Sequence, residues 1–197
     1  QVKIFPPQGL NVDDNFFSRQ REPGPENPGR KYIGVCASGR RLKAALIRVY
    51  VAVLAAAQAQ YDAYGLAADP WMTLVGYFNS LRELGGMRRL VDDDVRARLS
   101  KMDRRGLAVR KRLFVDELTS RKSSIDIPQI LDQLEVTFDP DVLSKIATAK
   151  KAGKKISTLE PLDVILATNM VSVGVDVKRL GAMVVAGQPK STAEYIQ

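Results

Sequence analysis

The sequence contains no histidine and only one cysteine, Cys36, among its 197 residues. A single cysteine excludes an internal disulfide, and together with the lack of histidine it excludes the usual zinc sites. The same lack excludes acid–base catalysis by histidine. Because no disulfide can staple the chain, the sequence suits a reducing compartment, and we expect a cytoplasmic protein.

Long hydrophobic runs are missing as well. No uninterrupted apolar run approaches the roughly 18 residues of a transmembrane helix, so we expect no association with a membrane. With 45% hydrophobic residues, the chain can still bury one core. Residues 1–30 contain the stretches PPQG and EPGPENPG, which are typical of an extended linker. We therefore expect a linker over residues 1–30 and one domain over residues 31–197.

Negative charge is in the minority, because 22 acidic residues stand against 30 lysines and arginines, which gives a net charge of +8. This balance suits a polyanionic partner such as nucleic acid. The charges are densest over residues 88–112, where an early stretch of mixed sign gives way to a mostly basic one. Two interpretations stay open for this stretch: a solvated helix and loop, or a patch that contacts phosphates.

Short apolar runs predict strands near residues 32–36, 73–78, 113–118, 163–167 and 182–186. The run at 164–167 is continuously apolar, which is typical of a strand buried on both faces of a parallel sheet. Helical patterns separate the strands. This alternation predicts an α/β fold, in which a parallel sheet with right-handed crossovers is flanked by helices.

Apolar residues at intervals of three to four predict a helix over residues 40–64, ended by Gly65: Leu42, Leu46, Val49, Val53 and Ala57. Ser80 is placed to cap a second helix that begins near residue 81. A third helix is expected over residues 126–136, with Pro128 in its first turn. The lysine-rich residues 145–155 predict a surface loop.

Phosphate-binding loops are also missing, because SGRRLKA and AGKK lack the G-x-x-x-x-G-K-[ST] frame. The next strand after residues 164–167 ends at Gly187, and Ser191 with Glu194 predicts a helix that is incomplete at Gln197. We therefore expect a fragment of a larger protein. Polar and glycine residues follow the strand at 164–167, at the place where open α/β sheets bind ligands: Thr168, Asn169, Ser172, Gly174 and Asp176.

At these residues the sequence resembles superfamily 2 helicases. The stretch ILATNMVSVGVDV resembles motif V, A-T-x-x-x-x-x-G-[IV]-D, and WMTLVGYFNS resembles motif IV. GQPKSTAEYIQ is similar to the run into motif VI, of which Gln197 would be the first residue. The strong part of the resemblance covers residues 71–197 and is most like the large helicases of DISARM-type phage-defence systems.

The resemblance implies a second RecA-like motor domain, which would contribute nucleic-acid contacts and one wall of an ATP site. Gly174, Asp176 and Gln197 would line the ATP wall, and no catalytic residue lies in this sequence. Val173 stands where many DEAD-box helicases carry an arginine, so the phosphate contact that this arginine makes in DEAD-box helicases is not expected here. The expected nucleic-acid contacts are Asn79 and Ser80 at motif IV, the turn residues Thr119, Ser120 and Arg121, and Thr168, Asn169 and Ser172 at motif V.

The expected cofactors are ATP and Mg²⁺ in the complete protein, with the Mg²⁺ ligands in a first motor domain outside this sequence. The expected partners are that domain, a nucleic acid that is DNA rather than RNA, and other subunits of a defence system. Leu113 to Glu117 also looks like a Walker B strand. That motif precedes motif IV in the family, so we assign the following residues 118–121 to a turn between motifs IV and V.

Two other functions stay open. A RecA-like scaffold can serve as a non-catalytic module that binds protein or nucleic acid, since fold alone does not fix function. A small nucleotide-binding enzyme of doubly wound fold is the third hypothesis. The glycine-rich first turn that such an enzyme needs is absent from the sequence.

Overall fold

The structure is a computed structural model that describes residues 22–153, 159–168 and 177–188. The chain divides into two units, Gln1–Ser38 and Gly39–Gln197. In the first unit, residues 22–38 form irregular chain with one antiparallel bridge between Gly24 and Asn27. The strand predicted near residues 32–36 is wrong. Tyr32 and Ile33 are 69% and 75% exposed, and this apolar run belongs to no strand within the described residues.

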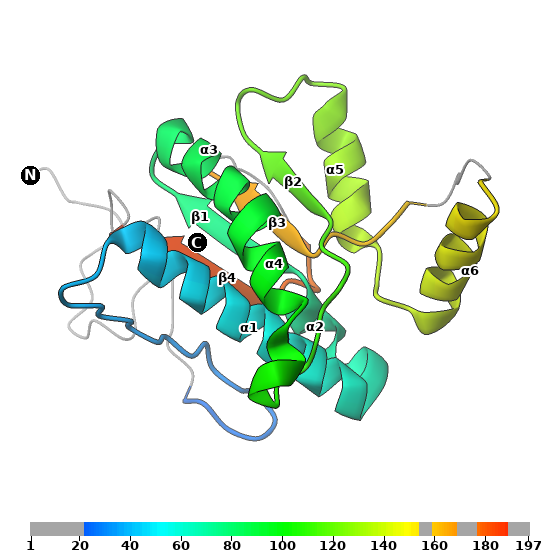
Figure 1. Ribbon diagram of the computed structural model, residues 1–197, viewed down its shortest axis with the longest axis horizontal. Helices are drawn as coiled ribbons and strands as arrows, with labels where there is room; N and C mark the ends of the chain where they lie inside the picture. Colours follow the sequence, from blue (N-terminus) through cyan, green and yellow to red (C-terminus); the bar gives the residue numbers. More distant parts are fainter. Residues whose placement is uncertain (1–21, 154–158, 169–176, 189–197) are drawn as a thin grey trace, which may run out of the picture. The chain divides into compact units, whose positions relative to one another are not determined.

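The second unit contains a parallel sheet, which confirms the predicted α/β fold (Figure 1). Its strands are β1 (Leu74–Phe78), β2 (Val115–Leu118), β3 (Val164–Ala167) and β4 (Ala182–Ala186). The spatial order is β2-β3-β1-β4, and every neighbouring pair is parallel. The strands expected near 73–78, 113–118, 163–167 and 182–186 are therefore confirmed. Together with the flanking helices, this arrangement is consistent with a RecA-like domain.

Helices cover both faces of the sheet (Figure 1). On one face, Leu74 and Phe78 of β1 pack against α1 (Leu42–Tyr64), α3 (Leu81–Leu90) and α4 (Arg96–Leu99). The π-helical turn η2 (Val91–Val95) joins α3 to α4. On the other face, Val75 of β1 packs against α5 (Asp126–Glu135). Alternate residues of one strand thus face two separate cores, which explains the continuous apolar runs in the sequence.

The predicted apolar stripe of α1 is confirmed in part, because Leu46 and Ala57 are buried whereas Leu42 is 55% exposed. The prediction missed Tyr50 and Leu54, which are fully buried against the sheet. The helix ends at Gly65, whose φ of 58° favours glycine, as predicted. The helical chain continues through η1 (Gly65–Ala68) and α2 (Asp69–Met72). By length and composition alone, Leu42–Met72 could cross a membrane, but its apolar side chains also supply much of the core described here.

The surface loop predicted over residues 145–155 is wrong for most of its length, because α6 spans Pro140–Lys151. Asp139 caps this helix by accepting hydrogen bonds from the N–H groups of Asp141 and Val142, and Pro140 occupies the first turn. Lys150 and Lys151 lie in the last turn, where positive charge favours a helix. Lysines therefore stabilise this helix end instead of marking a loop.

Candidate nucleic-acid interface

The carboxyl ends of all four strands lie at one edge of the sheet, because the strands are parallel. Each end is followed at once by a polar or glycine residue. In spatial order from β2 to β4 these residues are Thr119, Thr168, Asn79 and Gly187. β3 and β4 are not neighbours, since β1 lies between them. Asn79 at the end of β1 therefore lies between Thr168 at the end of β3 and Gly187 at the end of β4.

Asn79 joins the ends of β1 and β4. Its side-chain amide Nδ2 donates a hydrogen bond to the carbonyl oxygen of Gln188 at 2.9 Å. Gly187, with a φ of +79°, provides the turn that brings this carbonyl to β1. The side-chain oxygen Oδ1 of Asn79 is buried and has no hydrogen-bond partner in the described part of the chain. A buried polar atom without a partner costs about 1–3 kcal/mol, so this amide is held in place at some cost.

Ser80 begins α3, as the sequence predicts. Its hydroxyl oxygen accepts a hydrogen bond from the backbone N–H of Glu83 at 3.3 Å. The side chain is exposed, and the hydroxyl hydrogen is still available to donate. The first turn of a helix carries unpaired N–H groups and a partial positive charge, which favour an anion nearby. Ser80 can therefore present a donor to a phosphate while it caps the helix.

The turn after β2 presents two of its three predicted residues to solvent. Thr119 is fully buried, and its hydroxyl oxygen accepts a hydrogen bond from the N–H of Arg121 at 3.3 Å. Ser120 and Arg121 are exposed. The geometry gives Thr119 a role in forming the turn, and it leaves Ser120 and Arg121 as the groups that a ligand can reach.

The acidic pair on β2 does not form a metal site with other residues of the described ranges. Asp116 accepts hydrogen bonds from the ammonium group of Lys122 at 2.7 Å and from the N–H of Glu117 at 2.7 Å. Within residues 22–153, 159–168 and 177–188, no group of three or more His, Cys, Asp or Glu residues could hold a metal ion. The carboxylate of Asp116 thus serves as an ion-pair partner beside the turn at Thr119.

Thr168 follows β3 directly and is 6% exposed. It lies on the strand next to β1, so Thr168, Asn79 and Ser80 are brought to neighbouring strand ends. The other predicted residues of the motif V and motif VI stretches lie outside the described residues: Asn169, Ser172, Gly174, Asp176 and Gln197.

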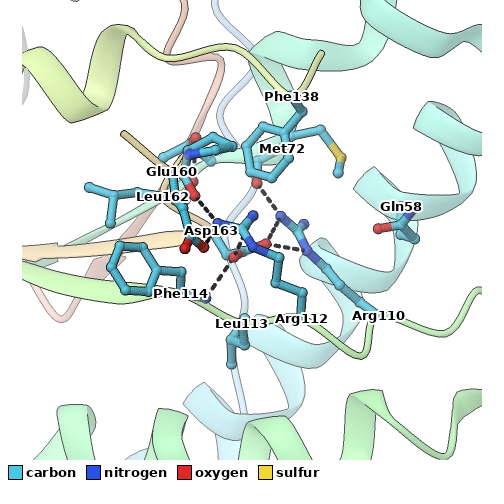
Figure 2. Close-up of polar contacts among 12 residues, drawn as sticks. Gln58, Met72, Arg110, Arg112, Leu113, Phe114, Phe138, Glu160, Leu162 and Asp163 are labelled. Carbon is cyan, nitrogen blue, oxygen red and sulfur yellow. Dashed lines mark hydrogen bonds and ion pairs between the residues drawn. The ribbon is translucent and has the colours of Figure 1, made fainter. Parts of the chain in front are cut away.

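The opposite edge of the sheet holds an ion-pair cluster that the sequence pattern did not indicate (Figure 2). Asp163, immediately before β3, is 1% exposed. One carboxylate oxygen accepts two hydrogen bonds from the Arg110 guanidinium, at 2.9 and 2.5 Å, and the other accepts one from the N–H of Phe114 at 2.6 Å. Arg110 also donates to the carbonyl of Met72 at 2.7 Å, which links the starts of β1, β2 and β3.

Arg112 extends this cluster toward solvent. Its guanidinium donates to the carbonyl of Pro161 at 2.5 Å and lies 3.3 Å from the second carboxylate oxygen of Asp163. Glu160 contacts the same guanidinium at 3.4 Å (Figure 2). The ring of Phe138 lies 5.4 Å from the Arg110 guanidinium and 5.7 Å from that of Arg112, both distances to the ring centroid. Cation–π contact thus adds to the ion pairs.

A second buried pair links α2 to the segment before β4. The Arg179 guanidinium binds both carboxylate oxygens of Asp69, at 2.8 and 3.0 Å. It also donates to the carbonyl of Leu134 on α5 at 2.8 Å. Both side chains are nearly buried, so these hydrogen bonds satisfy charges that would otherwise be costly. Neither pair could be found from sequence, because the partners are 53 and 110 positions apart.

The charged stretch 88–112 contains both exposed and buried parts. Arg88 and Arg96 pair with Asp92, and Arg89 with Asp93, at the half-exposed to exposed surface of the helices. This agrees with a solvated face for the early part. Near the end of this stretch, Arg110 is neither solvated nor free to contact a phosphate, so both interpretations are wrong for it. It is 3% exposed and hydrogen-bonded to Asp163. A buried carboxylate fixes this guanidinium within the fold, away from any phosphate.

No family model matches the sequence. A curated protein, the DISARM protein DrmA of Bacillus paralicheniformis, is 45% identical over an alignment of 197 positions that covers 98% of this chain. The alignment covers 16% of DrmA, so the chain spans about a sixth of that relative's length. The chain is therefore similar, over nearly its whole length, to one segment of a DISARM protein.

Proposed function

We propose that this chain forms part of the second motor domain of an ATP-dependent superfamily 2 helicase or translocase that acts in anti-phage defence. The observation that carries the proposal is the row of strand ends at one edge of the parallel sheet. There the motif IV residues Asn79 and Ser80 lie next to Thr168 of motif V. The similarity to DrmA supports the defence role, because DrmA is a DISARM protein.

In this proposal the strand ends contact the sugar–phosphate backbone of one nucleic-acid strand. Backbone contacts need short hydroxyl or N–H donors at fixed positions, and they carry no base sequence. Ser80 offers a hydroxyl at the start of α3, and Ser120 and Arg121 offer exposed donors after β2. Thr168 lies between these two groups, at the end of β3. The chain's charge of +8 favours the same kind of partner.

ATP would bind between this domain and a first motor domain of the same protein, which would supply the Mg²⁺ ligands. Gly174, Asp176 and Gln197 are proposed for this wall of the ATP site. Hydrolysis needs a phosphate-binding lysine and metal ligands, and the sequence lacks both motifs. The chain alone should therefore not turn over ATP. Sustained hydrolysis by the purified 197-residue chain, stimulated by nucleic acid, would contradict the proposal.

The decisive experiment is a pair of substitutions in the complete protein that contains this chain. Thr168→Val removes the hydroxyl and keeps the shape, whereas Thr168→Ser keeps the hydroxyl. We expect Thr168→Val to lower the nucleic-acid-stimulated ATPase rate about tenfold, which corresponds to ~1.4 kcal/mol. Thr168→Ser should retain most of the stimulated rate. Comparing stimulation by single-stranded DNA with that by RNA would identify the strand.

Thr148→Val is the matched control, because Thr148 is an exposed threonine on α6 whose hydroxyl bonds only locally, to the carbonyl of Ser144. It should leave the stimulated rate unchanged. Equal rates for Thr168→Val and Thr168→Ser would remove Thr168 from the phosphate contact. A complete protein that binds nucleic acid but shows no stimulated ATPase activity would favour the alternative function, a non-catalytic binding module.

A further inference from the structure

A groove of about 760 Å³ opens between α1 and the chain segment formed by α4 and the 3₁₀ helix η3 (Met102–Arg105). It is lined from α1 by Arg48, Val51 and Ala52, and from the other side by residues 93–107. None of the strand-end residues of the candidate nucleic-acid interface lines it. The groove is therefore a separate surface that the proposed motor function does not use.

The rim of this groove is basic. Its five lysines and arginines are exposed, and none has a salt bridge or side-chain hydrogen bond to another described residue. The lining contains two carboxylates, Asp93 and Asp94, so it has an excess of three positive charges. Asp93 is already paired with Arg89 at 3.7 Å. The unpaired cations are Arg48, Arg98, Lys101, Arg104 and Arg105.

The remaining lining of the groove is apolar. Val51 and Met102 belong to the core and form its base, and both are nearly buried. Leu107 also lines the groove and is 50% exposed, so its side chain is accessible to a ligand. No aromatic side chain lines the groove in the described part of the chain.

We propose that this groove binds an acidic amphipathic helix of a partner protein. Helix-in-groove recognition places apolar side chains on an apolar base and leaves the polar face of the helix to the rim. Here Val51, Met102 and Leu107 supply the base and wall, and the surplus cations match acidic residues. A nucleic-acid strand fits less well, because phosphates gain nothing from an apolar base and the lining has no aromatic ring on which bases could stack.

The groove also has a direction. Asp93 and Asp94 lie in η2 at one end of the lining segment, whereas Lys101, Arg104 and Arg105 lie at the other end. The most acidic turn of the partner helix therefore lies over η3, away from the two aspartates. Reversing the order of acidic and neutral turns along the partner should weaken binding.

The test uses the 197-residue chain and a fluorescein-labelled helical peptide of leucine, alanine and glutamate. At about 18 residues the peptide would have about five turns. Fluorescence anisotropy should show binding that Arg98→Glu with Arg105→Glu weakens about tenfold or more. Lys145→Glu with Lys151→Glu is the matched control, because these exposed lysines on α6 change the net charge equally and lie outside the groove.

A second pair of variants tests the apolar wall. Leu107→Ser should weaken binding of the peptide, whereas Leu66→Ser should leave it unchanged. Leu66 is the matched control because it is equally exposed, at 49%, and does not line the groove. The proposal fails if a shuffled peptide of the same composition binds equally well, or if the groove and α6 variants behave alike. It also fails if an oligo-dT strand binds in a groove-dependent manner and the peptide does not.

Discussion

Asp163 shows how one side chain can hold several strands together. It is buried, and its two carboxylate oxygens bind Arg110, Arg112 and the backbone of Phe114. Because Arg110 is equally buried, loss of the carboxylate would leave a guanidinium charge without a counter-ion inside the fold. A surface pair such as Arg88–Asp92 has no such penalty, since water can solvate both groups.

We therefore predict that Asp163→Asn lowers the free energy of unfolding by about 3–5 kcal/mol. Asp92→Asn, which breaks the half-exposed pairs with Arg88 at 2.9 Å and Arg96 at 3.5 Å, should cost about 1 kcal/mol or less. Urea denaturation followed by circular dichroism measures both values. Similar losses for the two variants would mean that the buried cluster contributes no more than a surface pair.

Tyr50 and Gly76 form a second tightly fitted pair. The Tyr50 hydroxyl is buried without a partner among the described residues, and burial raises the pKa of Tyr50 well above its ordinary value of 10.0. A Cβ atom added to Gly76 in β1 would collide with this hydroxyl and lie 2.9 Å from Cδ2 of Leu166. Glycine is therefore required at this position by its neighbours and not by a turn.

Gly76→Ala should lower the free energy of unfolding by about 3 kcal/mol, because the core has no room for the methyl group. Tyr50→Phe should leave stability unchanged or raise it by up to about 1 kcal/mol, and it should recover part of the loss in the double variant. Since the unfolded tyrosine ionises first, Tyr50→Phe should also reduce the loss of stability above pH 10.0. If the unfolding free-energy changes of Gly76→Ala and Tyr50→Phe simply add in the double variant, the two residues are not in contact.

At this scale the sequence was a limited guide. Arg110 and Arg104 stand in the same basic stretch, and no spacing distinguishes the buried one from the exposed one. The distinction is made by Asp163, which is 53 positions away from Arg110. By contrast, Ser80 could be assigned as a cap, because the acceptor and the N–H of Glu83 are three residues apart.

Among the elements, α3 combines a structural and a proposed binding role in one residue, Ser80. Ser80→Ala removes the cap and should cost about 1 kcal/mol of stability. Ser80→Asp should keep the stability, since aspartate is an equally good cap, but its charge should repel a phosphate. Thermal unfolding combined with the binding of labelled single-stranded DNA separates the two roles. Unweakened DNA binding by Ser80→Asp would exclude Ser80 from the phosphate path.

Elements were predicted well where their burial is two-sided. β1 and β3 are buried at every position, because both faces of these strands are covered, and their sequences accordingly contain no charged residue. The run near residues 32–36 has similar composition but forms no strand in the part of the chain that the structure describes. Strand pairing depends on contacts that a local pattern does not contain. α6 was mistaken for a loop because its lysines were weighed without its cap, Asp139, and its first-turn residue, Pro140.

For the whole molecule, the described core includes no residue of Gln1–Ser38. A chain that begins at Gly39 should therefore unfold cooperatively, with a midpoint within about 4 °C of that of the 197-residue chain. Removal of residues 1–50 is the matched control, because it also deletes Leu46, Ile47 and Tyr50 from the core. Calorimetry should show a much lower midpoint or no transition for that control. An equally large drop in the unfolding midpoint on removal of residues 1–38 would contradict the division of the chain at Ser38.

The two edges of the sheet differ in a way that bears on protein engineering. The amino edge is clamped by buried arginine–carboxylate pairs, whereas Ser80, Ser120 and Arg121 stand exposed at the carboxyl edge. A combinatorial library at the exposed positions could sample new ligand preferences while the clamp keeps the scaffold intact. The residues that hold the scaffold together are thus separate from the exposed positions that can be varied.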